Sequence, residues 1–341
     1  MSFIVKDLVK SYGEKVVVDH LNLQMDAPGV YALLGTNGAG KTTSLRMILG
    51  MLQKDSGEVF YNGKPMDPKS MNIGYLAEER GLYPKYSLID QLLYFARLKG
   101  VSRSDAMKRI KHWSNRLELD EYLFPPKTAK GRAPKPKLAD QLSKGNQQKI
   151  QLMAALISDP EFIILDEPMS GLDPVNTDLF KEVIREEIAK DKYVIMSSHQ
   201  MPTIEEFCTD ITILDHGKTV LQGNLDDIKR SYGRVNLFVK CESQGIMNGG
   251  IEPLIEQAGL TIVEKLPSEY HIRVSSEAQA MEFLRMLIDE NVTIIRFELR
   301  EPSLHEIFVE KVGGYIPTEA EKEAAEKKEA EDAAKEKEGA E

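Results

Sequence analysis

Hydrophobic positions recur with two different periods along this 341-residue chain. Apolar and polar residues alternate in short runs through residues 1–25, which is typical of antiparallel strands. Val30–Leu34 is continuously apolar and predicts a buried strand, whereas apolar side chains recur every three or four residues over 45–52 and predict a helix. The same helical spacing continues from Ser87 to Glu121.

Strands and helices alternate through the second part of the chain. We expect strands at Phe162–Leu165, Tyr193–Ser197 and Ile211–Leu214, and helices near Ser143–Ser158, Val175–Ala189 and Met201–Cys208. This alternation predicts a mostly parallel sheet that helices cover on both faces.

The order of elements changes after about Leu225. The expected order becomes strand, helix, strand, strand, helix, strand, which is typical of a small ferredoxin-like domain. The expected elements are Val235–Lys240, Ile251–Ala258, Thr261–Leu266, Tyr270–Val274, Glu277–Glu290 and Val292–Leu299, with a last helix at Ser303–Val312.

Composition excludes several classes of protein. No apolar run approaches the ~20 residues that span a bilayer, the N-terminus lacks a signal-peptide pattern, and two cysteines, Cys208 and Cys241, form no disulfide framework. We therefore expect a reduced, cytoplasmic protein.

The formal charge is −10. Half of it lies in the Glu/Lys/Ala-rich tail Thr318–Glu341, where ten acidic residues stand against five lysines. The body is thus only mildly acidic, which disfavours a nucleic-acid binder.

A basic, proline-rich segment interrupts the helical pattern at residues 125–137. We expect a solvated loop there, and contact with anionic lipid headgroups is the alternative.

A glycine-rich segment follows the apolar strand and carries the first candidate chemistry. The sequence Gly35-Thr36-Asn37-Gly38-Ala39-Gly40-Lys41-Thr42 matches the phosphate-binding loop pattern in full, between a strand and a helix. Such a loop directs backbone amides and a helix N-terminus at phosphate oxygens. Lys41 can reach the β- and γ-phosphates and Thr42 can ligate Mg²⁺. With Thr43 directly after it, this segment is the expected binding site for the phosphates of a ligand.

Two carboxylates follow the strand Phe162–Leu165. Asp166 can hold Mg²⁺ through water, and Glu167 can orient or deprotonate an attacking water. Acidic residues at strand ends are common, but open α/β sheets bind ligands at the carboxyl ends of their strands. Together with the phosphate loop, the pair indicates nucleotide hydrolysis.

Further motifs identify a family resemblance. Leu142-Ser143-Lys144-Gly145-Asn146-Gln147-Gln148 resembles the signature motif of ABC ATPases, and Ser170-Gly171-Leu172-Asp173 resembles their D-loop. His199 resembles their switch histidine, and Tyr12 lies where the family has an aromatic residue that stacks on adenine. Taken singly, Ser143 is as well explained as a helix N-cap, Tyr12 as a core aromatic and His199 as a turn histidine. All motifs occur in the family's order over about residues 2–225.

The resemblance implies a head-to-tail dimer that encloses two ATP molecules. Ser143 and Gly145 of one copy would then contact the γ-phosphate held by the other copy, with Asp173 nearby, while Glu167, His199 and Lys41 would be catalytic.

Two positions depart from the family pattern. Lys144 and Asn146 alter the signature, and Glu78 stands where the Q-loop has a glutamine. Glu78 either binds Mg²⁺ through water or adds negative charge to an anionic site. In the neighbouring pair Glu79-Arg80, the arginine offers a way to neutralise that charge.

The expected fold class is an α/β P-loop NTPase of the ABC type, with an antiparallel β-subdomain and a helical subdomain. Its domains are a nucleotide-binding domain over 1–225 with a helical subdomain at about 85–158, a C-terminal α+β domain over 226–315, and a charged tail over 316–341.

The resemblance is strongest to ATPases of bacterial sodium, drug or peptide exporters. It implies ATP and Mg²⁺ as cofactors, a second copy of the domain, transmembrane permease subunits on separate chains and no nucleic acid. It also implies a place at the cytoplasmic face of the membrane. The helix Ser87–Leu98, with Leu88, Leu92, Leu93 and Phe95, is the expected docking surface for the permease. The alternatives are a soluble ABC ATPase in translation or DNA maintenance and a binding-only regulator.

Overall fold

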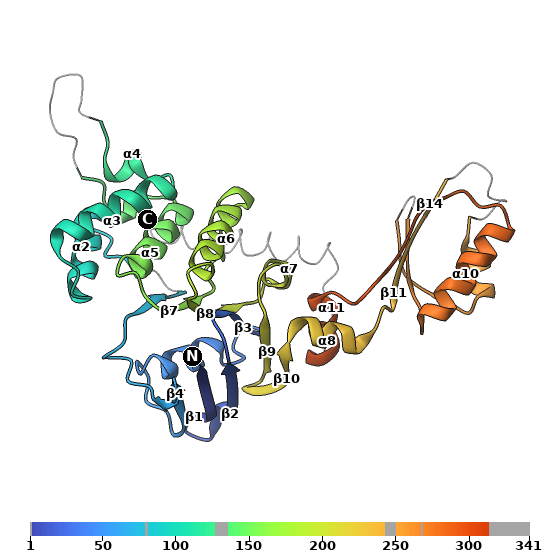
Figure 1. The fold of residues 1–341 in the computed structure, drawn as a ribbon, viewed down its shortest axis with the longest axis horizontal. Helices are drawn as coiled ribbons and strands as arrows, with labels where there is room; N and C mark the ends of the chain where they lie inside the picture. Colours follow the sequence, from blue (N-terminus) through green and yellow to red (C-terminus); the bar gives the residue numbers. More distant parts are fainter. Residues whose placement is uncertain (1, 79–80, 127–135, 243–249, 267–268, 314–341) are drawn as a thin grey trace, which may run out of the picture.

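The computed structural model describes residues 2–78, 81–126, 136–242, 250–266 and 269–313. Within these ranges it shows two bodies of unequal size, joined by extended chain and short helices (Figure 1). Three predictions fall wholly or mostly outside the described residues: the basic segment 125–137, the neighbours Glu79 and Arg80 of Glu78, and the charged tail over 316–341.

The larger body is built on a ten-stranded sheet with the order β5-β4-β1-β2-β10-β9-β3-β8-β7-β6. Its antiparallel part contains β1 (Phe3–Tyr12), β2 (Lys15–Met25), β4 (Ser56–Tyr61) and β5 (Lys64–Pro65). Its other part contains β6 (Ile73–Leu76), β7 (Phe162–Asp166), β8 (Tyr193–Ser198), β3 (Gly29–Gly35), β9 (Asp210–Asp215) and β10 (Lys218–Asn224). The strands from β9 through β3 and β8 to β7 and β6 are parallel, as predicted.

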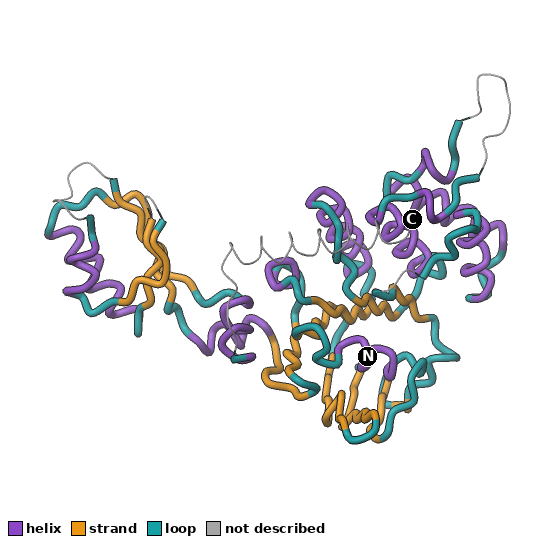
Figure 2. The backbone as a smooth tube through the Cα atoms, turned by 180° about the vertical axis from the view of Figure 1, so that it is seen from behind, coloured by secondary structure: helices purple, strands orange, loops and turns teal. Residues whose placement is uncertain are grey.

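The continuous apolar run of β3 is explained by burial on both faces. Val30, Ala32 and Leu34 belong to one hydrophobic cluster, and Tyr31 and Leu33 belong to the other. Because successive strand residues point to opposite faces, a strand between two packed layers has no polar position. Helices cover the sheet (Figure 2): α1 (Lys41–Ile48), α5 (Lys144–Leu156), α6 (Pro174–Ile188) and α7 (Met201–Glu205). The predicted helix Met201–Cys208 thus ends at Glu205.

The helical stretch predicted from Ser87 to Glu121 is divided into three helices. These are α2 (Leu88–Leu98), α3 (Arg103–Arg116) and α4 (Asp120–Leu123), followed by a single 3₁₀ turn at Ala139–Gln141. The helical conformation is interrupted between α2 and α3 at Gly100. This glycine has φ of 75°, a left-handed conformation that commonly ends a helix. Ser102 then begins α3, because its side chain accepts a hydrogen bond from the backbone N–H of Asp105 at 3.1 Å.

The smaller body has the predicted ferredoxin-like order of elements. It contains β11 (Asn236–Cys241), α9 (Glu252–Gln257), β12 (Thr261–Lys265), β13 (Glu269–Arg273), α10 (Glu277–Asp289) and β14 (Ile294–Arg300). The antiparallel sheet has the order β12-β13-β11-β14. Leu237, Val239 and Ile272 on one face pack with Phe283 and Leu287 of α10 in a separate core.

Two helices beside this small domain pack against the larger body instead. They are α8 (Leu225–Tyr232), which the sequence pattern did not reveal, and α11 (Leu304–Val312). Leu304 and Ile307 lie in a hydrophobic cluster of the larger body. Glu205, at the end of α7, accepts hydrogen bonds from the backbone N–H of Leu304 at 3.1 Å and from Lys229 of α8 at 2.6 Å. The predicted C-terminal domain 226–315 therefore includes two helices that anchor it to its neighbour.

Shortening Leu304 tests this anchoring. We expect Leu304→Ala to lower the free energy of unfolding of the larger body by about 2–5 kcal/mol, because a fully buried side chain leaves a cavity. Urea unfolding followed by the fluorescence of Trp113, the single tryptophan and a member of the same cluster, measures the change. Leu98→Ala, at a leucine that is 64% exposed, is the matched control. Equal effects of the two substitutions would contradict the packing of α11.

Candidate active site

The glycine-rich loop connects β3 to α1 and lies at the carboxyl end of the parallel strands. Gly40 has φ of 102°, and a Cβ atom there would lie 2.6 Å from the carbonyl oxygen of Val17. Only glycine fits both constraints, and the loop can therefore turn tightly into the first turn of α1. Ala39 packs into the core beneath, and the loop borders a cavity of about 230 Å³. The cavity is lined by Val17, Asn37, Gly38, Gly40, Lys41, Thr42, Thr43, Glu78 and Glu167.

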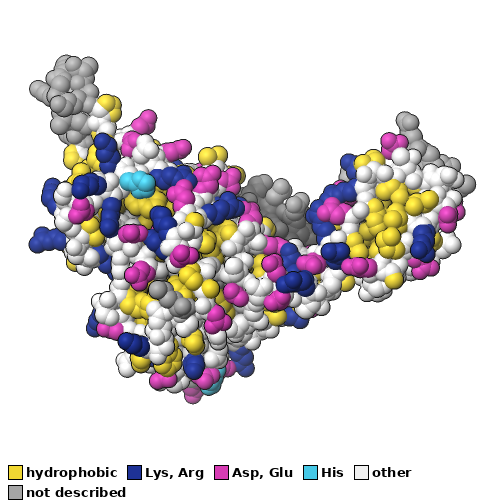
Figure 3. All heavy atoms as spheres, in the orientation of Figure 1, with side chains coloured by type: hydrophobic (Ala, Val, Ile, Leu, Met, Phe, Trp, Pro, Cys, Tyr) yellow, Lys and Arg dark blue, Asp and Glu magenta, His cyan; other side chains and the backbone are white. Residues whose placement is uncertain are grey.

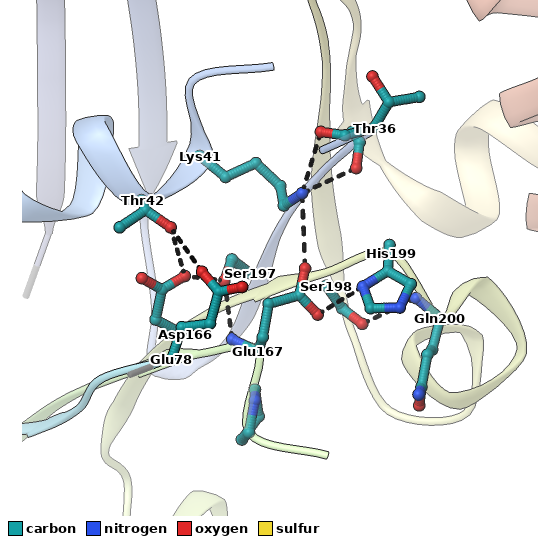
Figure 4. Close-up of polar contacts among 12 residues, drawn as sticks. Thr36, Lys41, Thr42, Glu78, Asp166, Glu167, Ser197, Ser198, His199 and Gln200 are labelled. Carbon is teal, nitrogen blue, oxygen red and sulfur yellow. Dashed lines mark hydrogen bonds and ion pairs between the residues drawn. The ribbon is translucent and has the colours of Figure 1, made fainter. Parts of the chain in front are cut away.

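Lys41 is buried, and its ammonium group is held at three oxygen atoms. Its Nζ donates to the carbonyl oxygens of Gly35 at 2.8 Å and Thr36 at 3.2 Å, and lies 3.5 Å from Oε1 of Glu167 (Figure 4). An ammonium group exposes three donors, so it can exchange these oxygens for those of a phosphate without leaving the loop. The arrangement provides a fixed positive charge beside inward-facing backbone amides.

Asp166 ends β7 and lies directly beside the loop. Its Oδ1 accepts hydrogen bonds from Thr42 Oγ1 at 3.1 Å and from Ser197 Oγ at 2.5 Å (Figure 4). Its Oδ2 is buried and has no hydrogen-bond partner. Burial raises the pKa of this carboxyl, and the hydrogen bonds from Ser197 and Thr42 oppose the rise. A buried, unpaired carboxylate oxygen beside a hydroxyl group is suited to a hard divalent cation.

Glu78 follows β6, and its carboxylate also lies beside the Thr42 hydroxyl group. Thr42 Oγ1 lies 3.4 Å from Oε2 of Glu78 as well as 3.1 Å from Asp166, so hydroxyl and carboxylate oxygens from three elements converge. Among the described residues no group of three or more His, Cys, Asp or Glu side chains forms a complete metal cage. Mg²⁺ commonly takes one or two carboxylates and completes its shell with water and substrate phosphates. These residues fit that pattern.

Glu167 and His199 form the second polar contact of the cavity. Glu167 has φ of 48°, and its N–H donates to Ser197 Oγ at 3.0 Å, which holds the carboxylate at the mouth of the cavity. His199 Nδ1 lies 2.8 Å from Glu167 Oε2. Burial alone raises the pKa of Glu167, but the hydrogen bond with His199 and the positive charges of His199 and Lys41 bring it below its usual value. The hydrogen bond to Glu167 raises the pKa of His199, against the opposing effect of burial.

The signature and D-loop residues lie elsewhere in the same chain. Ser143 is the N-cap of α5 and accepts from the backbone N–H of Asn146 at 3.2 Å, and Asp173 is the N-cap of α6 and accepts from that of Asn176 at 3.0 Å. The two helix starts are neighbours, since a Cβ atom on Gly145 would lie 3.4 Å from Nδ2 of Asn176. Ser143, Gly145 and Asp173 do not line the phosphate-loop cavity.

Tyr12 is an exposed side chain, which contradicts its alternative reading as a core aromatic. Its ring is 54% exposed, and Lys10 Nζ lies 5.3 Å from the ring centroid. It does not line the cavity around Lys41. The ring is thus solvent-exposed, with the Lys10 ammonium group over it.

Sequence reasoning missed Ser197 and Val17. Ser197 pairs with Asp166 in the register of β7 and β8, so it becomes visible only when two strands far apart in sequence are aligned. Val17 reaches the cavity from β2, whose alternating pattern carries no signal of a site.

Comparison with known proteins places these features in one family. Residues 18–170 match the family described as ABC transporter, and residues 223–312 match that described as the C-terminal domain of ATP-binding protein DrrA1-3-like. The chain is 40% identical over 310 residues to the ABC transporter ATP-binding protein YhaQ of Bacillus subtilis, covering 91% of this chain and 98% of that protein. It is 29% identical over 254 residues to the Nod factor export ATP-binding protein I of Cupriavidus metallidurans, covering 73% and 78%. A solved ATP-binding subunit of an ABC transporter matches with a TM-score of 0.60 and 28% identity, covering 68% of this chain and 94% of that one.

The contact between Glu167 and His199 makes a prediction about titration. We expect His199 to titrate above 6.5 in the wild type and closer to that value in Glu167→Gln, because the substitution removes the negative charge that favours the imidazolium. NMR of the imidazole resonances measures both values. The raised pKa means that the contact stabilises the fold below about pH 6.5, and that this stabilisation is lost as the pH rises through the folded-state value. An unchanged pKa of His199 in the variant would contradict the contact.

Proposed function

This chain belongs to the ABC transporter ATP-binding family, whose members hydrolyse ATP in transporters, and we propose that it powers an exporter through transmembrane subunits on separate chains. The observation that carries the proposal is one connected set of contacts at the cavity. Lys41, Thr42 and Glu167 line the cavity. Asp166 contacts Thr42, and His199 contacts Glu167. The export direction is supported by relatives whose names include Nod factor export. No helix among the described residues is long and apolar enough to cross a membrane.

Each residue at the cavity has its own role in ATP hydrolysis. The loop amides and Lys41 bind the β- and γ-phosphates, while Thr42, Asp166 and Glu78 supply the oxygen atoms that hold Mg²⁺. Mg²⁺, when bound, neutralises phosphate charge. Glu167 orients the attacking water and accepts its proton, for which its lowered pKa keeps it ionised at neutral pH. His199 positions the Glu167 carboxylate through its hydrogen bond of 2.8 Å.

The positions of Ser143 and Gly145 support a dimer as the working unit. Both lie at the start of the 13-residue helix α5, where backbone N–H groups and the helix dipole favour an anion. In the head-to-tail arrangement of the family, this helix start faces the γ-phosphate on the second copy, and Asp173 lies beside it. Two copies of this chain then form two equivalent sites at the cytoplasmic face of the membrane, and Tyr12 stacks on adenine.

Two of the residues predicted to dock the membrane subunit are not available at the surface. Leu88 and Leu92 were expected to dock the permease, but both are buried in the core of the helical subdomain. Leu93 and Phe95 are partly buried against the same core. The exposed large hydrophobic side chains of this region are Tyr83, Tyr86, Tyr94 and Leu98. They border or belong to α2, shortly after Glu78, and we assign the docking surface to them.

Two substitutions separate binding from hydrolysis. Lys41→Ala should abolish detectable ATP binding, because the buried positive charge at the loop is lost. Glu167→Gln should retain binding and lower the hydrolysis rate by about 10²–10⁴-fold, the usual loss when a general base is removed. Fluorescent-nucleotide titration and steady-state ATPase assays measure the two effects, with the exposed Lys218→Ala as control. Rapid hydrolysis by Glu167→Gln would refute the role of that carboxylate.

The docking surface has its own test. Tyr86→Glu, at a side chain 63% exposed, should reduce co-purification of the polytopic membrane subunit from detergent extracts while leaving ATP binding unchanged. The control is Met51→Glu, since Met51 is 64% exposed and lies outside this surface. Undiminished co-purification with Tyr86→Glu would remove the assignment.

A further inference from the structure

The C-terminal domain exposes apolar side chains that its own fold does not cover. On α10, Ala280, Phe283 and Leu287 face the core, whereas Met281 and Ile288 on the outer face are 51% and 59% exposed. Leu284 lies between them on the helix and is half-buried. Figure 3 shows a broad apolar area on this domain. Such an area on a small domain indicates an interface.

The strand next to α10 is the edge of the sheet. β14 pairs with β11 on one side and has no partner on the other among the described strands. Ile295 sits at a bulge in that pairing and is 55% exposed. From Arg296 onward the strand is regular, and Arg296, Glu298 and Arg300 share one face, where Glu298 accepts hydrogen bonds from both arginines. An unpaired edge with exposed backbone groups is a template for another strand.

Among the symmetric registers centred on residues 296 to 298, the charges along β14 are compatible with a second β14 in only one. In an antiparallel pair, residues directly opposite each other lie on the same face of the sheet. In a symmetric pair, the two-fold axis must therefore lie between the two copies of one residue, so that this residue faces its own copy. An axis at Glu298 would oppose two glutamates and bring Arg296 to Arg300, and an axis at Arg296 would oppose two arginines. An axis at Phe297 instead brings each Arg296 to the Glu298 of the other copy, and each Ile295 to the opposite Leu299.

The other edge of the sheet lacks this complementarity. β12 is also exposed, but its pairing with β13 has a bulge between Ile262 and Glu264, and its two charged residues, Glu264 and Lys265, are adjacent. Adjacent strand residues lie on opposite faces and cannot face each other across a two-fold axis. The charged part of the chain's own tail does not suit the apolar area either, because after Pro317 it contains no apolar residue larger than alanine.

We propose that the C-terminal domain pairs with that of a second copy through β14 and α10, about a two-fold axis at Phe297. The same axis reverses α10, which packs beside β14, so Met281 of one copy comes toward Ile288 of the other. This contact needs no nucleotide. It would keep two copies together between cycles of ATP-driven closure, and it is independent of the dimer at the phosphate loop.

The full-length chain in EDTA, without nucleotide, provides the first test. Analytical ultracentrifugation should find a concentration-dependent dimer, and Ile288→Glu should raise its dissociation constant at least about tenfold, while ATP binding stays unchanged. Val263→Glu is the matched control, since Val263 is 55% exposed on the opposite edge. A wild-type chain that stays monomeric up to about 100 µM, or equal effects of the two substitutions, would overturn the proposal.

A charge exchange tests the register. Arg296→Glu alone opposes glutamates across the axis, and Glu298→Arg alone opposes arginines, so each variant should be mainly monomeric. Mixing the two variants should restore a dimer, because every position 296 then faces an opposite charge at position 298. Only contact between copies explains rescue by mixing. If the mixture stays monomeric while the wild type dimerises, the axis does not lie at Phe297 and the proposed pairing is wrong.

Discussion

The site depends on charged side chains that are buried away from water and must therefore be paired or hydrogen-bonded. Lys41, Asp166 and Glu167 are all at least nine-tenths buried, within one small region at the carboxyl ends of parallel strands. Burying charged groups is costly unless they are paired or hydrogen-bonded. Here the loop carbonyls hold the ammonium, and Ser197 and Thr42 hold Asp166. The rest of the fold serves to bring these groups together from β3, β7 and β8 and to keep them fixed.

The C-terminal domain is attached through the segment that follows His199 in the chain. The chain leaves the site at His199 and continues directly into α7, whose last residue, Glu205, binds Lys229 of α8 and the start of α11. Glu206 beside it accepts a hydrogen bond from Lys181 of α6, the helix whose N-cap is Asp173. Through these contacts α7 connects the helix after the D-loop with both helices that anchor the small domain.

Much of the fold could be predicted because burial leaves a simple pattern. β3 and the first four residues of β7 and β8 are covered on both faces and are therefore continuously apolar. A glycine is needed at position 40, where the backbone turns tightly. Other features depend on contacts that no local pattern contains. β10 alternates between exposed and partly exposed residues and has no apolar run. The spacing of Leu88 and Leu92 predicts a helix, but only the packed subdomain shows that these leucines face inward. Ser197 joins the site solely through the register of β8 with β7.

The most direct measurement is the structure of Glu167→Gln with ATP and Mg²⁺. The account predicts two copies arranged head to tail, with each triphosphate between Lys41 of one copy and Ser143 and Gly145 of the other. A nucleotide bound away from the glycine-rich loop, or one bound there with Ser143 and Gly145 of both copies remote from it, would contradict the account.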